Sequence, residues 1–297
     1  MTQWIVTLCE QDAIVKLKEA GADELLVSVP FFSLRAARVF SCDQLAELSA
    51  KIHDAGMRIA VNCTRFFMED ELEQLRSFLR LLKEIDADTV YFADEGVLYE
   101  AIQLGMQDRL VYQPDTLITN SADAAFYRAQ GCQGVSLARE ITLEEICAIA
   151  SRCSGVEMLV HGRFSIMHSR RQLLHSYFAF LKRPDDDPHG RRDLSLKEET
   201  REAHMPIIED EGGTHVFSEY TLQSFAQIRT LVESGVSRLR IDSIFRDDDW
   251  SVRALSDYQS VLAGRLSPQE AIERWDREDP SGCYGEGFYY TKTSLVK

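Results

Sequence analysis

The residues best suited to chemistry stand in a short apolar segment, Val156–His161, which a glycine follows. Within it, Glu157 and His161 are four positions apart, so both side chains point to the same side of a regular strand. A carboxylate and an imidazole can exchange protons near neutral pH, where the ordinary pKa of histidine lies. We therefore predict Glu157 and His161 as catalytic residues. The alternative is a core strand whose polar side chains are only hydrogen bonded.

Strand-like apolar segments alternate with amphipathic helix-like segments roughly every 20 to 30 residues, about the length of a βα unit. Eight such strands are predicted: Trp4–Cys9, Glu24–Val29, Arg58–Cys63, Thr89–Ala93, Leu110–Tyr112, Gly134–Leu137, Val156–His161 and Arg238–Ile244. The pattern predicts an α/β fold, a (β/α)8 TIM-barrel-like domain over residues 1–265. A C-terminal helix and a glycine- and aromatic-rich tail follow at 266–297. An open doubly wound sheet is the alternative, although no Gly-x-Gly-x-x-Gly follows the first strand.

The alternation of strand-like and helix-like segments is interrupted between the seventh and eighth strands, where residues 163–218 form an excursion. We expect a helix-like piece around Arg170–Phe180 and a β-hairpin that turns at Gly212-Gly213. A further helix is predicted at Leu222–Ser234, after the excursion.

In a barrel, the C-terminal ends of the strands meet at one mouth, where side chains can form a site. Polar residues stand at these ends: Cys9, Glu10, Asn62, Cys63, Asp94, Glu95, Gln113, Asp115, Arg139, Glu140, Glu157, His161 and Asp242. The residues predicted to bind substrate are Asn62, Asp94, Gln113, Arg139, Glu140, Gly162 and Asp242. The alternative is that the rim is polar only because it is solvated.

The excursion contains the one locally basic stretch, with cations at Arg163, Arg170, Arg171, Lys182, Arg183, Arg191 and Arg192. Aromatic residues are interleaved with them, a composition that suits a phosphate backbone and stacked bases. The alternative, which the residues alone favour slightly, is a solvated face that neighbouring acidic residues neutralise.

Composition limits the function classes. The formal net charge of −15 argues against binding of nucleic acid over the whole surface, so neither DNA nor a membrane is expected as a partner. No apolar run approaches the roughly 20 residues of a membrane helix, and no signal peptide is recognised. Seven scattered cysteines suit a reducing cytoplasm. No metal site is predicted, because neither Cys-x-x-Cys nor His-Glu-x-x-His occurs.

Several motifs, in this order, resemble the peptidase U-32 family, also called collagenase-like peptidases. They are Gly21-Ala22-Asp23, Asn62, Asp94-Glu95-Gly96, Thr119-Asn120-Ser121, Arg139-Glu140-Ile141-Thr142-Leu143-Glu144-Glu145-Ile146, Glu157-Met158-Leu159-Val160-His161-Gly162 and Ser195-Leu196-Lys197-Glu198-Glu199-Thr200-Arg201, followed by Pro206-Ile207 and Glu209-Asp210. The combination is similar to the shorter of two paired members found in Gram-positive bacteria.

The resemblance implies that His-Gly continues into a run whose cysteines, in several members, hold an iron–sulfur cluster. Here that run is Arg163–Ser169 and contains no cysteine, so no cofactor is expected in this chain. The better-defined members take part in oxygen-independent hydroxylation: of the tRNA wobble uridine with prephenate as the implied oxygen source, of ribosomal RNA cytidine, and of ubiquinone precursors. Some act in pairs.

These implications support one leading hypothesis and two alternatives. The chain would support 5-hydroxyuridine formation at the wobble position of tRNA beside a longer, cluster-bearing paralogue, with prephenate as a co-substrate of the pathway. Glu157 and His161 would line the mouth, and Arg163, Arg170 and Arg171 would contact RNA or the partner. The family name implies a peptidase instead, whose activity His161→Ala would abolish. The third reading is a non-catalytic scaffold subunit.

Overall fold

Eight parallel strands form a closed barrel, as predicted. The computed structural model describes residues 2–183, 185–197, 199 and 203–293. The barrel strands are β1 (Gln3–Thr7), β2 (Glu24–Ser28), β3 (Arg58–Cys63), β4 (Thr89–Phe92), β5 (Leu110–Tyr112), β6 (Gly134–Ser136), β7 (Val156–Gly162) and β13 (Arg238–Ile241). Each pairs with the next, and β13 pairs in parallel with both β7 and β1. This closure excludes the open doubly wound sheet.

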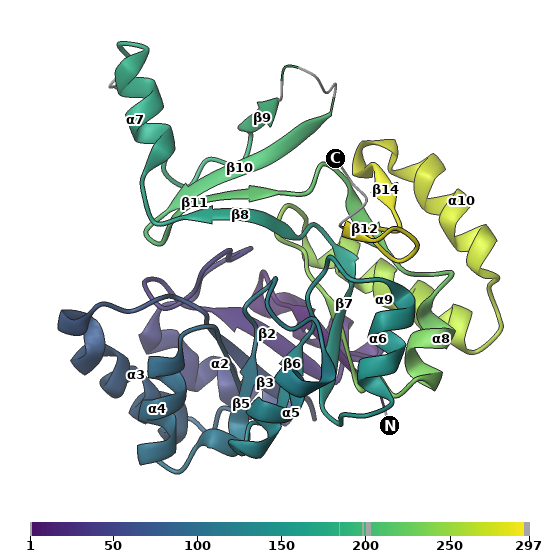
Figure 1. Ribbon diagram of the computed structural model, residues 1–297, viewed down its shortest axis with the longest axis horizontal. Coiled ribbons are helices and arrows are strands. Elements are labelled where there is room, and N and C mark those ends of the chain that lie inside the picture. Colours follow the sequence, from purple (N-terminus) through teal and green to yellow (C-terminus); the bar gives the residue numbers. More distant parts are fainter. Residues whose placement is uncertain (1, 184, 198, 200–202, 294–297) are drawn as a thin grey trace.

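Helices surround the barrel (Figure 1), and their buried apolar residues belong to the same core as those of the strands. The helices are α1 (Ile14–Ala20), α2 (Cys42–Asp54), α3 (Leu72–Glu84), α4 (Glu95–Gln103), α5 (Ser121–Ala129), α6 (Leu143–Ala150), α8 (Ile228–Glu233) and α9 (Asp248–Leu262). In α3, for example, Leu75, Phe78, Leu79 and Leu82 are buried at helical spacing. A capping box between Thr142 and Glu145 fixes the start of α6, as that spacing predicts. Short 3-10 turns at Gln11–Ala13 and Glu69–Glu71 precede α1 and α3.

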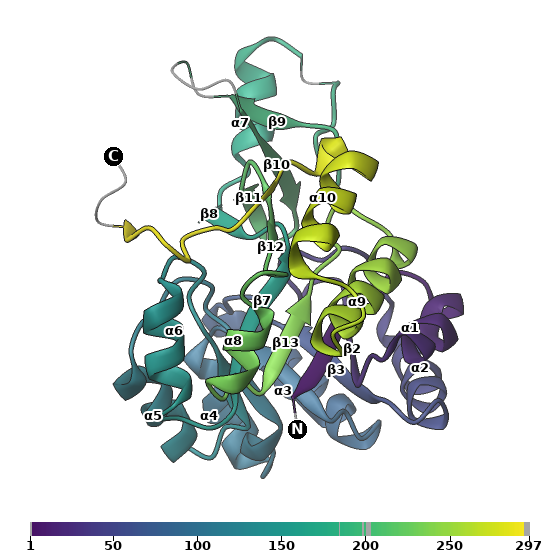
Figure 2. The same cartoon turned by 90° about the vertical axis from the view of Figure 1, so that its right-hand side faces the viewer.

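The excursion forms a separate antiparallel sheet that lies over the C-terminal ends of the barrel strands (Figures 1 and 2). Its strands are β8 (Ser165–Ser169), β9 (Ser195–Lys197), β10 (His204–Asp210) and β11 (Gly213–Phe217), in the spatial order β8-β11-β10-β9. One face places Phe217 and Ile208 against Ile244 beside the barrel. Helix α7 (Leu173–Phe180) packs Leu174 on the opposite face. The sheet therefore acts as a roof over the mouth.

Three predicted elements differ in the structure. Residues 165–169 form strand β8, because they pair with β11, and α7 begins only at Leu173 rather than at Arg170. The hairpin is confirmed, but Asp210 pairs with Gly213, so its turn lies one residue earlier, at 211–212. The segment predicted as a helix from Leu222 begins as strand β12 (Thr221–Gln223), which pairs antiparallel with β7. In the motif that begins at Ser195, Glu198, Thr200 and Arg201 lie outside the described residues.

The C-terminal segment packs back on the barrel. Helix α10 (Pro268–Glu278) buries Trp275, and the two-residue strand β14 (Tyr284–Gly285) pairs with β12. Within the described ranges, every helix is too short or too polar to span a membrane.

Candidate functional site

A polar cavity lies at the barrel mouth, beneath the roof. Five of the predicted site residues line it: Asn62, Gln113, Arg139, Arg163 and Asp242. They come from the ends of β3, β5, β6, β7 and β13, so the barrel topology brings together side chains that are far apart in the sequence. The roof contributes Ser165 and Phe217 to the same cavity.

Arginines and aspartates alternate around the cavity. Asp115 lies 2.8 Å from Nη1 of Arg35 and 3.5 Å from Nη2 of Arg139. Arg35 and Asp115 both have left-handed backbone conformations, with φ of 56° and 68°, which are costly for residues other than glycine. This strain is concentrated where the two side chains meet, which is typical of a functional site.

The pKa values of the acidic groups at the mouth diverge. Burial alone would raise the pKa of Asp115, but Arg35, Arg139 and Arg240 outweigh it and lower the pKa below its ordinary value. For Asp242 burial prevails and raises the pKa, although Arg240, Arg139 and Arg35 oppose it. Asp115 is thus a fixed anion, whereas Asp242 is the carboxyl better suited to exchange a proton.

Positive charge is in excess at the mouth. Arg35, Arg139, Arg163 and Arg240 line the cavity together with only two carboxylates, Asp115 and Asp242. Burial, and then the neighbouring Arg240, lower the pKa of Arg139 to about 10, so it stays protonated at neutral pH. The Nε atoms of Arg139 and Arg240 are buried and have no hydrogen-bond partner among the described residues. Unsatisfied buried donors beside surplus cations suit a small anion, such as a carboxylate.

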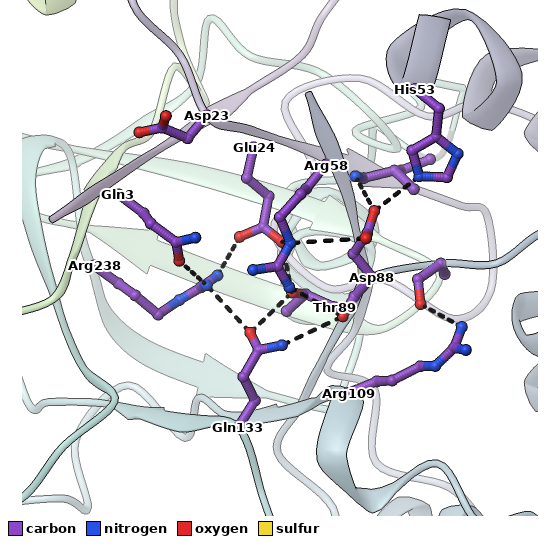
Figure 3. A network of polar contacts seen from close by, with 12 residues as sticks. Gln3, Asp23, Glu24, His53, Arg58, Asp88, Thr89, Arg109, Gln133 and Arg238 are labelled. Carbon is purple, nitrogen blue, oxygen red and sulfur yellow. Dashed lines mark hydrogen bonds and ion pairs between the residues drawn. The ribbon is translucent and has the colours of Figure 1, made fainter. Parts of the chain in front are cut away.

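Below the cavity, the barrel interior holds a buried ionic network, and Figure 3 shows its part around Glu24, Arg238 and Gln133. Arg238 is its centre and pairs with Glu24, while its Nε lies 3.3 Å from Glu157. The Tyr91 hydroxyl donates a hydrogen bond to Glu157. Glu157 is fully buried and does not line the mouth cavity. It therefore lies in the core of the barrel, deeper than we predicted.

His161 does not share the side of Glu157, and that part of the prediction is wrong. The ladder between β7 and β13 shifts its register, since Arg240 lies opposite Leu159 but Ile241 lies opposite His161. This bulge breaks the two-residue alternation and turns His161 out of the barrel. Its ring lies among aromatic side chains, with centroid distances of 4.8 Å to Trp250 and 4.9 Å to Trp275.

The surroundings keep His161 neutral. Its Nδ1 lies 3.1 Å from the Tyr258 hydroxyl, and burial lowers its pKa to about 3. An imidazole that cannot be protonated near neutral pH, and that is fully buried outside the cavity, is poorly suited to general acid catalysis at the mouth.

Replacing His161 by phenylalanine is expected to flatten the pH dependence of stability. In the folded state the pKa of His161 lies below its unfolded value of about 6.5. The neutral imidazole therefore makes its full contribution to the free energy of unfolding above that pH, and this contribution is lost as the pH falls toward 3. Urea unfolding of wild type should show a free energy that declines between roughly pH 6.5 and 4.5, with a smaller decline in His161→Phe. The exposed His204→Phe serves as the matched control. Equal slopes in wild type and His161→Phe would contradict this assignment.

The other predicted residues lie outside the mouth cavity. Asp94 caps α4, because its carboxylate accepts hydrogen bonds from the backbone N–H groups of Gly96 and Phe67, both at 2.7 Å. Glu140 follows β6, and its carbonyl oxygen accepts a hydrogen bond from the Thr293 hydroxyl. Arg170 and Arg171 are exposed on the roof.

Gly162 has a backbone function. Its φ is +135°, and an added Cβ would lie 2.4 Å from the carbonyl oxygen of Asp242. Only glycine permits this close approach of β7 to the end of β13.

The prediction missed Arg35 and Arg240 as site residues. Arg240 could have been found, because Arg238, Arg240 and Asp242 occupy alternate positions of an otherwise apolar strand, which indicates an inward-facing polar row. Arg35 lies in the loop after β2, where no periodic signal exists.

The comparisons with known proteins agree with this architecture. The family model for peptidase family U32 matches residues 11–293. The chain belongs to peptidase family U32. It is 25% identical over 261 residues to the tRNA hydroxylation protein P2 of Bacillus subtilis (strain 168), which covers 87% of this chain and 84% of the relative.

Two relatives of Escherichia coli (strain K12) are also similar to this U32 chain. The tRNA hydroxylation protein P is 22% identical over 320 residues, covering 90% of this chain and 70% of that protein. The 23S rRNA 5-hydroxycytidine C2501 synthase is 24% identical over 281 residues, covering 92% of this chain but only 40% of that protein. Among solved structures, the U32 peptidase Mk0906 superimposes with a TM-score of 0.51 at 16% identity, covering 82% of this chain and 92% of that one. This likeness supports the fold.

The side chains of this U32 member do not fit an iron–sulfur cluster. The segment Arg163–Ser169 supplies no thiol. Cys9 follows β1 and Cys63 ends β3, but both are buried, and burial raises the pKa of each thiol above its ordinary value. Across the described part of the chain, no three His, Cys, Asp or Glu side chains are grouped so that they could hold a metal ion. We derive no chemical step through a cluster in this chain.

Proposed function

We propose that this chain takes part in RNA hydroxylation, and that its substrate is the wobble uridine of tRNA. The names of three relatives, each connected with hydroxylation of tRNA or with 5-hydroxycytidine of rRNA, support the reaction class. The choice of tRNA follows the relative that this chain matches over 84% of its length. The observation that carries the proposal in the structure is the arginine-rich cavity at the mouth.

Within this proposal, the mouth binds the small oxygen donor. Prephenate carries two carboxylates, and the four arginines of the lining outnumber its two aspartates, so the mouth suits a dianion. Asn62 and Gln113 add amide groups at the same rim. Converting C5–H of uridine to C5–OH is a two-electron oxidation, and we assign the redox centre to a longer, cluster-bearing paralogue that works beside this chain.

The peptidase alternative finds less support in the geometry. Among the described residues, the lining of the mouth cavity contains neither histidine nor cysteine, so no imidazole stands beside a nucleophile there. The competing hypothesis is a scaffold role, in which the mouth is inactive. Mutations of residues that line the mouth distinguish it from the proposed function.

The proposal is tested by nucleoside mass spectrometry of bulk tRNA from cells with and without the gene. We expect 5-hydroxyuridine derivatives to disappear on deletion and to return with a wild-type copy. A paralogue with the same activity could hide this effect, so any second gene of the family with a similar length is deleted in the same strain. Unchanged 5-hydroxyuridine in that strain would refute the proposal.

A further inference from the structure

One stretch of the surface has a charge opposite to that of the whole chain. Residues 163–183 contain five Lys or Arg residues and no Asp or Glu, in a chain whose formal net charge is −15. We call this stretch, which includes β8 and α7, the arm; Figure 1 shows α7 projecting from the barrel. Arg170, Arg171 and Lys182 of the arm are exposed. Arg170 lies close enough to Glu71 to help lower the pKa of that carboxyl. Exposed cations in a stretch without acidic residues suit a phosphate backbone.

A column of stacked rings includes one residue of the arm, His168, and two residues from other segments. His168 of β8 stacks on His215 of β11, with centroids 4.5 Å apart and planes within 2°. Phe66, in the loop after β3, continues the column 5.9 Å from His168 at 18°. Phe66 is 38% exposed, so one end of the column remains accessible. Accessible aromatic rings are the platforms on which single-stranded bases stack.

Hydrogen bonds hold this column in place. Nε2 of His168 lies 3.2 Å from the carbonyl oxygen of Gly212, and Nε2 of His215 lies 3.3 Å from the carboxylate of Asp210. The column is therefore a fixed platform, which loses little conformational entropy when a base stacks on it.

A small cavity lies between the exposed end of the column and Arg170 of the arm. Phe66, His168, Arg65 and Arg170 line it, together with Leu34, Glu211 and Gly212. We call this cavity the shelf. Leu34 also lines the mouth cavity, so the shelf borders the candidate site.

The charges at the shelf single out Arg170. Arg65 is already paired with Glu71 at 2.8 Å and stacks over Phe31 at 4.0 Å. Glu211 contributes a carboxylate, so the shelf itself is nearly neutral. The exposed cations Arg170, Arg171 and Lys182 all belong to the arm. The shelf therefore suits an uncharged base, and the arm suits phosphates.

We propose that the arm and the shelf form the RNA-binding surface of this chain. Arg170, Arg171 and Lys182 contact phosphates of a single-stranded loop, and one base stacks at Phe66 next to the nucleotide that enters the mouth. The inference rests on the proposed function and names the surface that delivers its substrate. RNA fits better than a protein partner, because flat rings and exposed cations adjoin the mouth itself.

Binding of bulk tRNA to the purified full-length chain tests this surface. We expect Arg170→Glu/Arg171→Glu to weaken binding at least tenfold and to reduce the slope of log K against log salt by about two. Phe66→Ala should weaken binding roughly tenfold. The matched controls, Arg152→Glu at the end of α6 and Phe126→Ala on α5, also change exposed residues but lie away from the mouth, and should bind as wild type does. Circular dichroism and the thermal midpoint verify that each variant is folded.

A second readout separates this inference from the proposed function. The same variants replace the wild-type gene in cells, and 5-hydroxyuridine in tRNA is measured. If deletion abolishes the modification but the arm and shelf variants restore it fully, the surface is wrong while the proposed function stands. If deletion leaves the amount of 5-hydroxyuridine unchanged, both the proposed surface and the proposed function are refuted. Unaltered tRNA affinity in variants that lose the modification would also overturn the RNA assignment, in favour of docking to a protein.

Discussion

Replacing Arg139 by methionine is expected to lower 5-hydroxyuridine in tRNA to roughly one hundredth of the wild-type level. Its guanidinium is almost fully buried at the mouth, and its Nε has no partner among the described residues. Removing the arginine partner of a bound, buried carboxylate costs about 2–5 kcal/mol of binding free energy, which corresponds to a loss of 30-fold or more. The effect should appear in nucleoside mass spectrometry of cells whose only copy of the gene carries the variant.

Arg139→Met should leave the fold nearly intact. Asp115 keeps its shorter ion pair, at 2.8 Å with Arg35, and methionine fills much of the volume of the arginine stem. Arg152→Met, at the exposed end of α6, is the matched control and should retain full hydroxylation. In calorimetry, prephenate should bind the control but not Arg139→Met. A folded Arg139→Met protein that restores the modification fully would favour the scaffold account.

The second large effect concerns stability. Arg238→Met is expected to reduce the free energy of unfolding by about 3–5 kcal/mol, because it leaves Glu24 and Glu157 buried without their central cation. Arg238 also donates to Tyr91 at 3.0 Å and to Gln133 at 3.2 Å, so several acceptors lose their partner together. Urea unfolding of the purified proteins measures the difference.

Two further variants serve as comparisons for Arg238→Met. Arg80→Met removes an exposed arginine that pairs with Glu73 at 3.6 Å, and should cost less than about 1 kcal/mol. Adding Glu24→Gln to Arg238→Met removes one of the stranded charges and should recover part of the loss. A loss for Arg238→Met as small as that for Arg80→Met would show that the network contributes little.

The barrel could be predicted because each βα unit carries its own signals. Apolar strand segments, amphipathic stripes such as Leu75–Leu82, and the Thr142 cap are local in the sequence, and the structure agrees with them. The mouth residues Asn62, Gln113, Arg139 and Asp242 followed from the rule that strand ends meet.

The predictions that failed concern features that depend on contacts between segments distant in the sequence. Whether His161 faces inward depends on the register between β7 and β13, and the bulge there has no signature in the strand itself. Leu222 and Gln223 are predicted as the start of a helix but pair with β7, so tertiary pairing overrides the local pattern. Likewise, β8 exists because β11 lies beside it.

Oligonucleotide mass spectrometry of one set of cells tests the central claim most directly. Anticodon fragments of tRNA and fragments of 23S rRNA are measured from wild-type, deletion and restored strains. The account predicts that the deletion strain loses one oxygen atom from the wobble uridine of the anticodon fragments, that restoration returns it, and that the rRNA fragments do not change. An unchanged anticodon fragment, or an oxygen lost from rRNA alone, would contradict the account.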